Sequence, residues 1–202
     1  IELYSPKLKK IQRNKIKDKK VRWIKSLNEL KGGPIIFIAN EFFDSLPIKQ
    51  IYNKKKSFYE RHVVYSKNKN KLVFLNKKAK KDLINKIKKL KLVAGTNLVE
   101  YPISAINYLK IISKKIKKYD GGLLIIDYGY IKNKGYNTLQ AVKKHKYSKI
   151  LSQPSNTDIT SQINYSLFNK ILKKNYLDVN KIVNQSKFLQ RLGIVERANI
   201  IS

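Results

Sequence analysis

Residues 35–41 read Ile-Ile-Phe-Ile-Ala-Asn-Glu, a continuous apolar run that ends abruptly in an amide and a carboxylate. Gly32-Gly33-Pro34 breaks the chain just before the run. A short apolar run rich in β-branched residues is typical of a strand buried on both faces, as the strands of parallel sheets are. We therefore predict a central strand over residues 35–39.

The same pattern returns at residues 123–128, which read Leu-Leu-Ile-Ile-Asp-Tyr after Gly121-Gly122. Between the two runs, Ile106, Leu109, Ile112 and Ile116 recur at helical spacing. We expect Ser104 to cap this helix. A strand, a helix and a second buried strand are typical of a parallel α/β unit.

Weaker signals predict the remaining elements. Ser5-Pro6 begins a helix, because serine caps well and proline suits the first helical position, and Leu8, Ile11 and Ile16 give that helix an apolar stripe. The other predicted elements are a short strand at 21–24, an antiparallel hairpin at 57–65 and 71–75 around 67–70, and helices at 82–90, 167–173 and 186–192, the last closed by Gly193.

Together these elements predict an open, mostly parallel α/β sheet with a hairpin insertion at about 50–76 and a loop-rich insertion at about 130–165. Ligands of such sheets bind at the carboxyl ends of the strands. The polar residues at the predicted strand ends are Glu2, Asn40-Glu41 and Asp127.

Composition excludes several classes of protein. The 202 residues carry 45 Lys and Arg against 13 Asp and Glu, a formal charge of +32, and contain no Cys. No apolar run approaches the roughly 20 residues of a membrane span. Without Cys there are no disulfides, thiolate nucleophiles or Cys-ligated zinc sites.

The high positive charge has two interpretations. It could serve to bind nucleic acid, because lysines that neutralise phosphates strengthen binding. Arg, the usual reader of phosphates and bases, occurs only five times against 40 Lys, as a genome rich in A and T would produce. The lysines are spread along polar helix faces, so we expect nucleic acid not to be the partner.

Each strand end has a chemical and a structural reading. Glu2 could accept hydrogen bonds from a cofactor ribose or be an exposed terminal residue. Asn40-Glu41 could hold a guanidinium or orient an amine, or could cap the next segment together with Asp44. Asp127-Tyr128 could form a crevice wall or end the strand in a turn.

Other chemistries find no support in the sequence. His62 and His145 are the only histidines and have no suitably spaced partners, so we expect no metal site. No Ser-His-Asp arrangement is visible. The 13 tyrosines are dispersed and form no stacking platform for single-stranded nucleic acid.

The segment Asn40 to Pro47 (NEFFDSLP) resembles the hallmark of the MidA family of S-adenosylmethionine-dependent methyltransferases, which includes a mitochondrial complex I assembly factor. Further segments resemble the family in the same order, and the resemblance covers almost the whole chain. They are residues 2–8 (ELYSPKL), 59–61 (YER), 121–129 (GGLLIIDYG), 138–145 (TLQAVKKH), 158–160 (DIT) and 188–198 (FLQRLGIVERA).

The resemblance implies a Rossmann-like fold that transfers a methyl group from S-adenosylmethionine to a protein, in the mitochondrial member to an arginine of a complex I subunit. It assigns Glu41, Asn40 and Asp44 to catalysis. The implied binding residues are Glu2, Ser5 and Asn40 for the cofactor, and Glu60, Arg61, Asp127 and Tyr128 for the substrate. It places the protein in the cytoplasm if bacterial, or else in the mitochondrial matrix, and leaves a homodimer open.

The chain also departs from the pattern. Arginine methyltransferases carry a second Glu nine residues after the first, whereas this chain has Gln50, so Asp44 or Glu60 would have to supply the second carboxylate. Two other functions stay open: a non-enzymatic assembly factor on a methyltransferase scaffold, and a basic RNA-binding or RNA-modifying protein.

The chain begins at Ile1 inside a predicted element, and the family's glycine-rich cofactor loop would precede Glu2. We therefore expect an internal segment, incomplete at both ends and inactive by itself. Residues 1–202 should bind S-adenosylmethionine weakly or not at all, because no segment supplies the backbone N–H groups for the methionine carboxylate. Titration calorimetry tests this expectation, and micromolar binding would contradict it.

Overall fold

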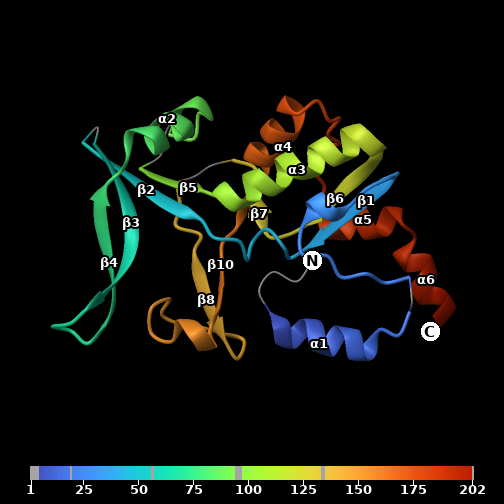
Figure 1. Ribbon diagram of the computed structural model, residues 1–202, viewed down its shortest axis with the longest axis horizontal. Helices are drawn as coiled ribbons and strands as arrows, with labels where there is room; N and C mark the ends of the chain where they lie inside the picture. Colours follow the sequence, from blue (N-terminus) through green and yellow to red (C-terminus); the bar gives the residue numbers. More distant parts are fainter. Residues whose placement is uncertain (1–4, 19, 56, 94–96, 133–134, 202) are drawn as a thin grey trace.

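The computed structural model describes residues 5–18, 20–55, 57–93, 97–132 and 135–201 (Figure 1). A parallel pair of strands lies beside helices α3 and α4, and an antiparallel sheet with helix α2 forms the opposite end of the molecule. Two more small sheets are formed by the strands that follow β6 in the chain. The chain is therefore an α/β protein, as predicted.

The parallel pair consists of β1 (Ile35–Asn40) and β6 (Gly121–Ile126). The register runs from Ile35 opposite Gly121 to Asn40 opposite Ile126, so both strands end at the same edge. Helix α3 (Ile103–Tyr119) packs against both strands. The two apolar runs thus form the parallel unit that the sequence predicts.

The expected burial of β1 on both faces is wrong for the described residues. Ala39 is buried, whereas Ile36 and Ile38 are 76% and 70% exposed. Side chains alternate between the faces of a strand, and no described element covers the face that carries Ile36 and Ile38. An apolar run thus indicates a strand, but does not show which elements cover it.

Gly121 allows the two strands to start side by side. Its φ is +125°, and a Cβ at this position would lie 1.8 Å from the carbonyl oxygen of Ile35. A side chain there would strain the backbone and collide with β1. The glycine pair before the second apolar run therefore has a steric role.

The predicted hairpin belongs to a larger antiparallel sheet with the order β4-β3-β2-β5. Its strands are β2 (Lys49–Lys54), β3 (Ser57–Ser66), β4 (Lys71–Lys78) and β5 (Leu98–Tyr101). Parallel pairing is confined to β1 with β6 and to β7 with β11 in the described residues. The prediction of a mostly parallel sheet is therefore wrong for the described residues, because β2 pairs in antiparallel fashion both with the adjacent β3 and with β5, which is distant in sequence.

The loop-rich stretch contains short strands. β8 (Gln140–Lys143) pairs with β9 (Lys146–Tyr147) and with β10 (Asp158–Thr160), after the single turn η2 (Pro154–Asn156). β7 (Gly129–Tyr130) pairs in parallel with β11 (Ile163–Asn164). These strands bring the chain that follows β6 back toward the antiparallel sheet (Figure 1).

Most predicted helices are confirmed. α2 (Lys81–Lys89), α4 (Tyr165–Lys174) and α5 (Gln185–Arg191) match the patterns, and the turn η1 (Leu27–Glu29) and helix α6 (Ile194–Ile201) are additional. The cap at Ser104 is wrong. Helix α3 begins at Ile103, two residues before the start that a cap at Ser104 would give, because the carbonyl of Pro102 already accepts the N–H of Ile106 at 3.0 Å.

Helix α1 (Pro6–Lys15) begins as predicted, with the Ser5 hydroxyl accepting the N–H of Leu8 at 3.2 Å. Its apolar stripe is largely exposed. The strand predicted at 21–24 is wrong: no described strand pairs with this segment, and Trp23 instead donates its indole N–H to Gln12 of α1 at 2.9 Å.

Phe43 joins the turn after β1 to the hydrophobic core. Its side chain is 1% exposed, and its ring meets Phe168 of α4 edge to face at 5.1 Å between centroids. Phe42 packs edge to face on Phe43 at 5.1 Å and on Tyr108 of α3 at 5.2 Å. The residues directly after the Asn-Glu pair thus anchor that turn to two helices.

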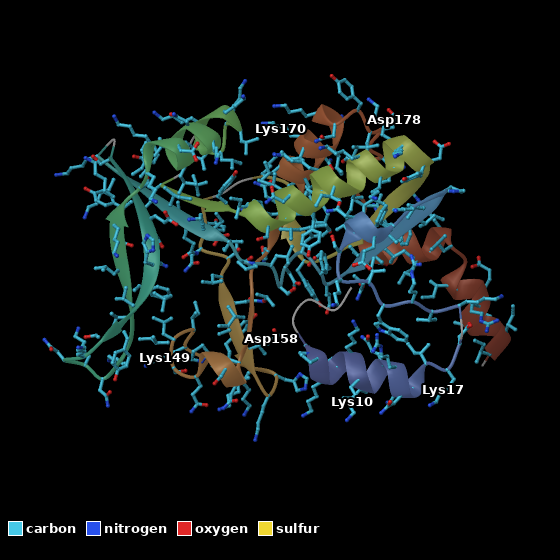
Figure 2. All side chains as sticks on the ribbon, viewed as in Figure 1. Lys10, Lys17, Lys149, Asp158, Lys170 and Asp178 are labelled. Atoms are coloured by element: carbon cyan, nitrogen blue, oxygen red, sulfur yellow. The ribbon has the colours of Figure 1, made fainter. Side chains whose placement is uncertain are left out.

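Most positive charges lie at the surface without a carboxylate partner. Figure 2 shows Lys10 and Lys17 near α1, Lys149 beyond β9 and Lys170 on α4 at separate parts of the periphery. Among the described residues, lysine makes ion pairs with carboxylates only in Lys49–Glu60 and Lys86–Asp82. None of the helices described here is long and apolar enough to cross a membrane.

Replacing Phe43 should show how strongly this anchor stabilises the fold. We expect Phe43→Ala to lower the free energy of unfolding by about 3–5 kcal/mol, because it removes a fully buried ring and leaves a cavity. Tyr147→Ala is the matched control, since Tyr147 is 82% exposed. Urea denaturation of both variants measures the difference, and equal losses would contradict the anchoring role.

Candidate functional site

The polar residues that follow the two parallel strands lie at the same edge of the sheet. Asn40 stands opposite Ile126, and the N–H of Glu41 donates to the carbonyl of Ile126 at 2.9 Å. Asp127 follows Ile126 directly in the chain. The structure therefore brings Asn40, Glu41 and Asp127 together, as the parallel arrangement predicts, whereas Glu2 lies outside the described residues.

Asp127 uses its carboxylate to hold the turn after β1. One oxygen, Oδ2, accepts the N–H groups of Phe43 and Asp44 at 3.0 and 3.2 Å. The other, Oδ1, accepts the N–H of Tyr128 at 2.8 Å. Three backbone donors on one carboxylate fix the turn relative to β6, so Asp127 positions the residues around it.

The side chain of Tyr128 is 65% exposed, while its backbone is tied into the sheet. Its carbonyl accepts the N–H of Ile163 at 2.9 Å, and the hydroxyl of Tyr165 donates to the carbonyl of Asp127 at 2.8 Å. The end of β6 is thus bonded on both sides of Asp127. Such a strand end has little freedom to move.

Glu41 and Asn40 present their side chains to solvent at this edge. Glu41 has a φ of +46°, in the left-handed region that non-glycine residues seldom occupy. Neither side chain hydrogen bonds to another group of the described chain. An unpaired carboxylate and an unpaired amide are therefore available to a ligand at the end of β1.

Asp44 lies within the same turn but is 8% exposed. Burial raises the pKa of its carboxyl group, the N–H of Ser45 partly opposes this, and the charges of Glu41 and Asp158 raise the pKa further. The carbonyl of Asp44 accepts the N–H of Ser161, after β10, at 2.9 Å. Asp44 thus connects the strand edge with the small sheet that contains β10.

Burial, together with the charge of Asp44, raises the pKa of Asp127 to about 6, although the N–H bonds from Asp44, Tyr128 and Phe43 lower it. Two carboxyl groups that repel one another make this edge a place where protons bind more readily than usual. Within the described residues no three His, Cys, Asp or Glu side chains form a group able to hold a metal ion.

Glu60 and Arg61, predicted to bind the substrate, lie on β3 and point to opposite faces of the antiparallel sheet. Glu60 is 9% exposed and pairs with Lys49 at 2.5 Å. Arg61 lines a pocket of about 330 Å³ that Asp44 also lines. The structure therefore joins Asp44 with Arg61 in one pocket, while Glu60 is occupied by Lys49.

Glu100 of β5 was not predicted from the sequence as a site residue, yet it is the centre of a half-buried polar network. It accepts the side-chain amide of Gln50 at 2.8 Å, the N–H of Thr138 at 3.0 Å and the hydroxyl of Thr138 at 2.5 Å. Burial and this carboxylate raise the pKa of Tyr130 to about 12. The only sequence signal was an acidic residue between Val99 and Tyr101 in an apolar strand.

Comparison with known proteins identifies related sequences. Residues 1–183 match a family described as "Putative S-adenosyl-L-methionine-dependent methyltransferase". A Caenorhabditis elegans protein described as "Protein arginine methyltransferase NDUFAF7 homolog, mitochondrial" is 26% identical over 179 residues, which cover 88% of this chain and 42% of that protein. The Danio rerio protein arginine methyltransferase NDUFAF7 is 27% identical over 186 residues, with 90% and 42% covered. The chain thus spans less than half the length of these curated relatives.

The fold is also similar to solved structures. A Burkholderia thailandensis protein, described as "a COG1565 superfamily member and likely methyl transferase" bound to S-adenosyl-homocysteine, matches with a TM-score of 0.71 at 19% identity, over 90% of this chain and 47% of that one. A native crystal structure from the same organism matches with a TM-score of 0.74, also at 19% identity, over 90% and 49%. At this identity the likeness concerns the fold.

The raised pKa of Asp127 should make stability depend on pH. Because the pKa of Asp127 in the folded protein, about 6, lies above the ordinary aspartate value of 3.8, the folded protein keeps a proton that the unfolded chain releases. The free energy of unfolding should therefore fall as the pH rises from about 4 to about 6, with Asp127 contributing on the order of 2 kcal/mol.

Asp127→Asn cannot titrate and should flatten this part of the pH profile, measured by urea denaturation between pH 4 and pH 6.5. Asp178→Asn removes an exposed carboxylate elsewhere and serves as the control. If the free energy of unfolding of Asp127→Asn changes with pH as steeply as that of the unaltered chain, the carboxyl group of Asp127 does not cause the pH dependence.

Proposed function

Because the chain belongs to the family of S-adenosyl-L-methionine-dependent methyltransferases whose sequence pattern spans residues 1–183, we propose that it is part of an enzyme that methylates arginine side chains of a protein. The family resemblance inferred from the sequence is confirmed by this match. The names of the mitochondrial relatives as protein arginine methyltransferases support arginine as the acceptor.

The observation that carries the proposal is the convergence of Asn40, Glu41, Asp44 and Asp127 at the carboxyl edge of the β1–β6 pair. A carboxylate can hold a guanidinium through two parallel hydrogen bonds, which fix its orientation as well as its position. Glu41 is unpaired and exposed, whereas Asp127 is used to fix the turn. Glu41 is therefore the proposed residue that binds and orients the acceptor nitrogen, with Asn40 beside it.

Asp44 is the proposed second carboxylate in place of the absent Glu at position 50. It lies three residues after Glu41, and its raised pKa reflects the charge of Glu41 as well as burial. A cationic guanidinium between the two would remove that repulsion. Glu60 is the weaker candidate, because Lys49 already neutralises it at 2.5 Å.

The groups at this edge fit the cofactor in charge. S-adenosylmethionine supplies a methyl group on a cationic sulfonium, and the edge offers carboxylates and an amide rather than cations. Glu2, Ser5 and Asn40 are the proposed cofactor contacts. Since the Ser5 hydroxyl accepts the N–H of Leu8 at 3.2 Å, its proposed contact with the cofactor is as a hydrogen-bond donor.

Methyl transfer to nitrogen is an in-line displacement, so alignment of the two reactants supplies most of the rate acceleration. The rigid end of β6 serves this purpose, because Asp127 holds the turn that carries Glu41 and Asp44. We further propose that β1 and β6 belong to a Rossmann-like sheet, with about 50–76 and 130–165 as insertions. A complex I subunit is the proposed substrate, and the cytoplasm or the mitochondrial matrix the proposed compartment.

Glu41→Gln, made in the protein at its full length, tests the role of the carboxylate. We expect turnover to fall about a hundredfold or more, because a preorganised charge at the reacting group is lost, while cofactor affinity changes little. Transfer of labelled methyl groups to protein measures turnover, and calorimetry measures cofactor binding. Glu196→Gln, on exposed α6, is the control of equal charge. Equal losses of turnover and cofactor affinity would argue against the proposed role of Glu41.

A further inference from the structure

The pocket of about 330 Å³ lies between three parts of the chain: the turn after β1, the antiparallel sheet, and the small sheet of β8 and β10. Leu46, Pro47, Val63, Leu139 and Ile159 give it mainly apolar walls. Two charged side chains line it as well, Asp44 and Arg61. The pocket therefore begins at the proposed acceptor site and extends to Arg61.

Arg61 is held firmly in this pocket by two aromatic rings. Its guanidinium carbon lies 4.5 Å from the ring centroid of Tyr52 and 4.7 Å from that of Phe74. Stacking of this kind is favourable for a guanidinium and restricts its plane. The N–H groups at the edge of the guanidinium then have fixed directions.

Arg61 is not neutralised by a carboxylate. Its Nη1 donates to Oε1 of Gln50 at 3.0 Å, and the Gln50 amide in turn donates to Glu100 at 2.8 Å and to Asn137 at 2.6 Å. Within the described part of the chain, Arg61 has no carboxylate oxygen within 4 Å. A neutral amide thus separates the positive charge of Arg61 from Glu100.

The Nε of Arg61 is buried and has no hydrogen-bond partner among the described residues. A buried donor without a partner is rare, and it leaves the hydrogen-bonding capacity of this guanidinium only partly used within the described chain. Glu100 is not that partner, because its oxygens accept from Gln50 and Thr138 and the structure records no bond between Glu100 and Arg61. The structure thus places an uncompensated guanidinium in an apolar pocket, next to the acceptor site.

We propose that this pocket is a recognition subsite for a carboxylate of the polypeptide substrate, bound by Arg61. The carboxylate belongs to an Asp or Glu residue that flanks the methylated arginine, whose own guanidinium lies at Glu41 and Asp44. That the ligand is a methylation substrate rests on the proposed function, whereas the carboxylate preference rests on Arg61 alone. A guanidinium at one end of the pocket and a carboxylate at the other thus fit a segment that carries both charges.

Binding of two peptide sets to the protein tests the subsite without cofactor or turnover. Each heptapeptide has a central arginine and glycine at the other positions, except for one Asp in the first set. The Asp is placed at each flanking position in turn. The second set carries Asn in place of Asp at the same positions. Fluorescence anisotropy at about 0.15 M salt, where the Debye length is about 8 Å, limits attraction by the distant lysines. At one or more positions we expect the Asp peptide to bind about tenfold more tightly than its Asn partner, as a charge-assisted hydrogen bond would produce.

Arg61→Gln should bring the Asp-to-Asn ratio close to one, and Arg61→Lys should keep part of it. Arg191→Gln is the matched control, because it removes one positive charge from exposed α5 and should leave the ratio unchanged. If Arg61→Gln does not fold, methyl resonances of Leu139 and Ile159 in the unaltered protein report the same binding. They should shift with the Asp peptide more than with the Asn peptide.

Equal affinities for Asp and Asn peptides at every position would overturn the proposal, as would equal effects of Arg61→Gln and Arg191→Gln. Methylation assays of the protein at its full length on the same peptides separate this result from the proposed function. Carboxylate preference without methyl transfer to any peptide contradicts the enzyme and leaves the subsite standing. Methyl transfer without carboxylate preference contradicts the subsite alone.

Discussion

The site depends on one interaction: the carboxylate of Asp127 accepts hydrogen bonds from the backbone of the turn after β1. Its oxygens accept N–H groups from Phe43, Asp44 and its own neighbour Tyr128. This joins the ends of two strands that are far apart in sequence, and Phe43 fastens the same turn to the core through Phe168. Because the turn is held from both sides, Glu41 and Asp44 keep a fixed relation to the sheet edge. A site that aligns reactants requires such rigidity.

The chain as a whole is positively charged, whereas the carboxyl edge of the β1–β6 pair carries negative groups. The chain carries a formal charge of +32, yet the strand edge gathers carboxylates, and Asp127 has a pKa of about 6 because burial and Asp44 oppose its ionisation. Beyond about 8 Å at physiological salt, the surface lysines are largely screened, so local groups decide what binds at the edge. At lower salt the positive field would favour the approach of an acidic partner, whereas the carboxylates at the edge favour a cation. These two preferences are compatible in a polypeptide that carries both charges.

Local patterns predicted the elements well, but not the contacts between distant segments. The apolar runs at 35–39 and 123–126 and the stripe from Ile106 to Ile116 each form the predicted element, since a few neighbouring residues determine it. Parallel register then brings Asn40 and Asp127 to one edge. Whether Asp127 lines a crevice or binds backbone N–H groups depends on a turn 83 residues away, which no local pattern encodes. The exposure of Ile36 and Ile38 likewise depends on whether another element covers them. The same holds for residues 21–24, which form a strand only if another strand pairs with them.

This chain has Gln50 where arginine methyltransferases have a second Glu, and this difference changes the surroundings of Arg61. Gln50 is 4% exposed and stands in a row across the antiparallel sheet, between Arg61 and Glu100. A Glu at this position would pair with Arg61 and repel Glu100, so the guanidinium would be neutralised within the protein. The amide instead accepts from Arg61 and donates to Glu100, which satisfies both neighbours without cancelling the charge of Arg61. The absence of a second Glu thus coincides with an arginine whose charge no carboxylate of the described chain neutralises, and it leaves Asp44 as the proposed partner of Glu41 at the proposed acceptor site.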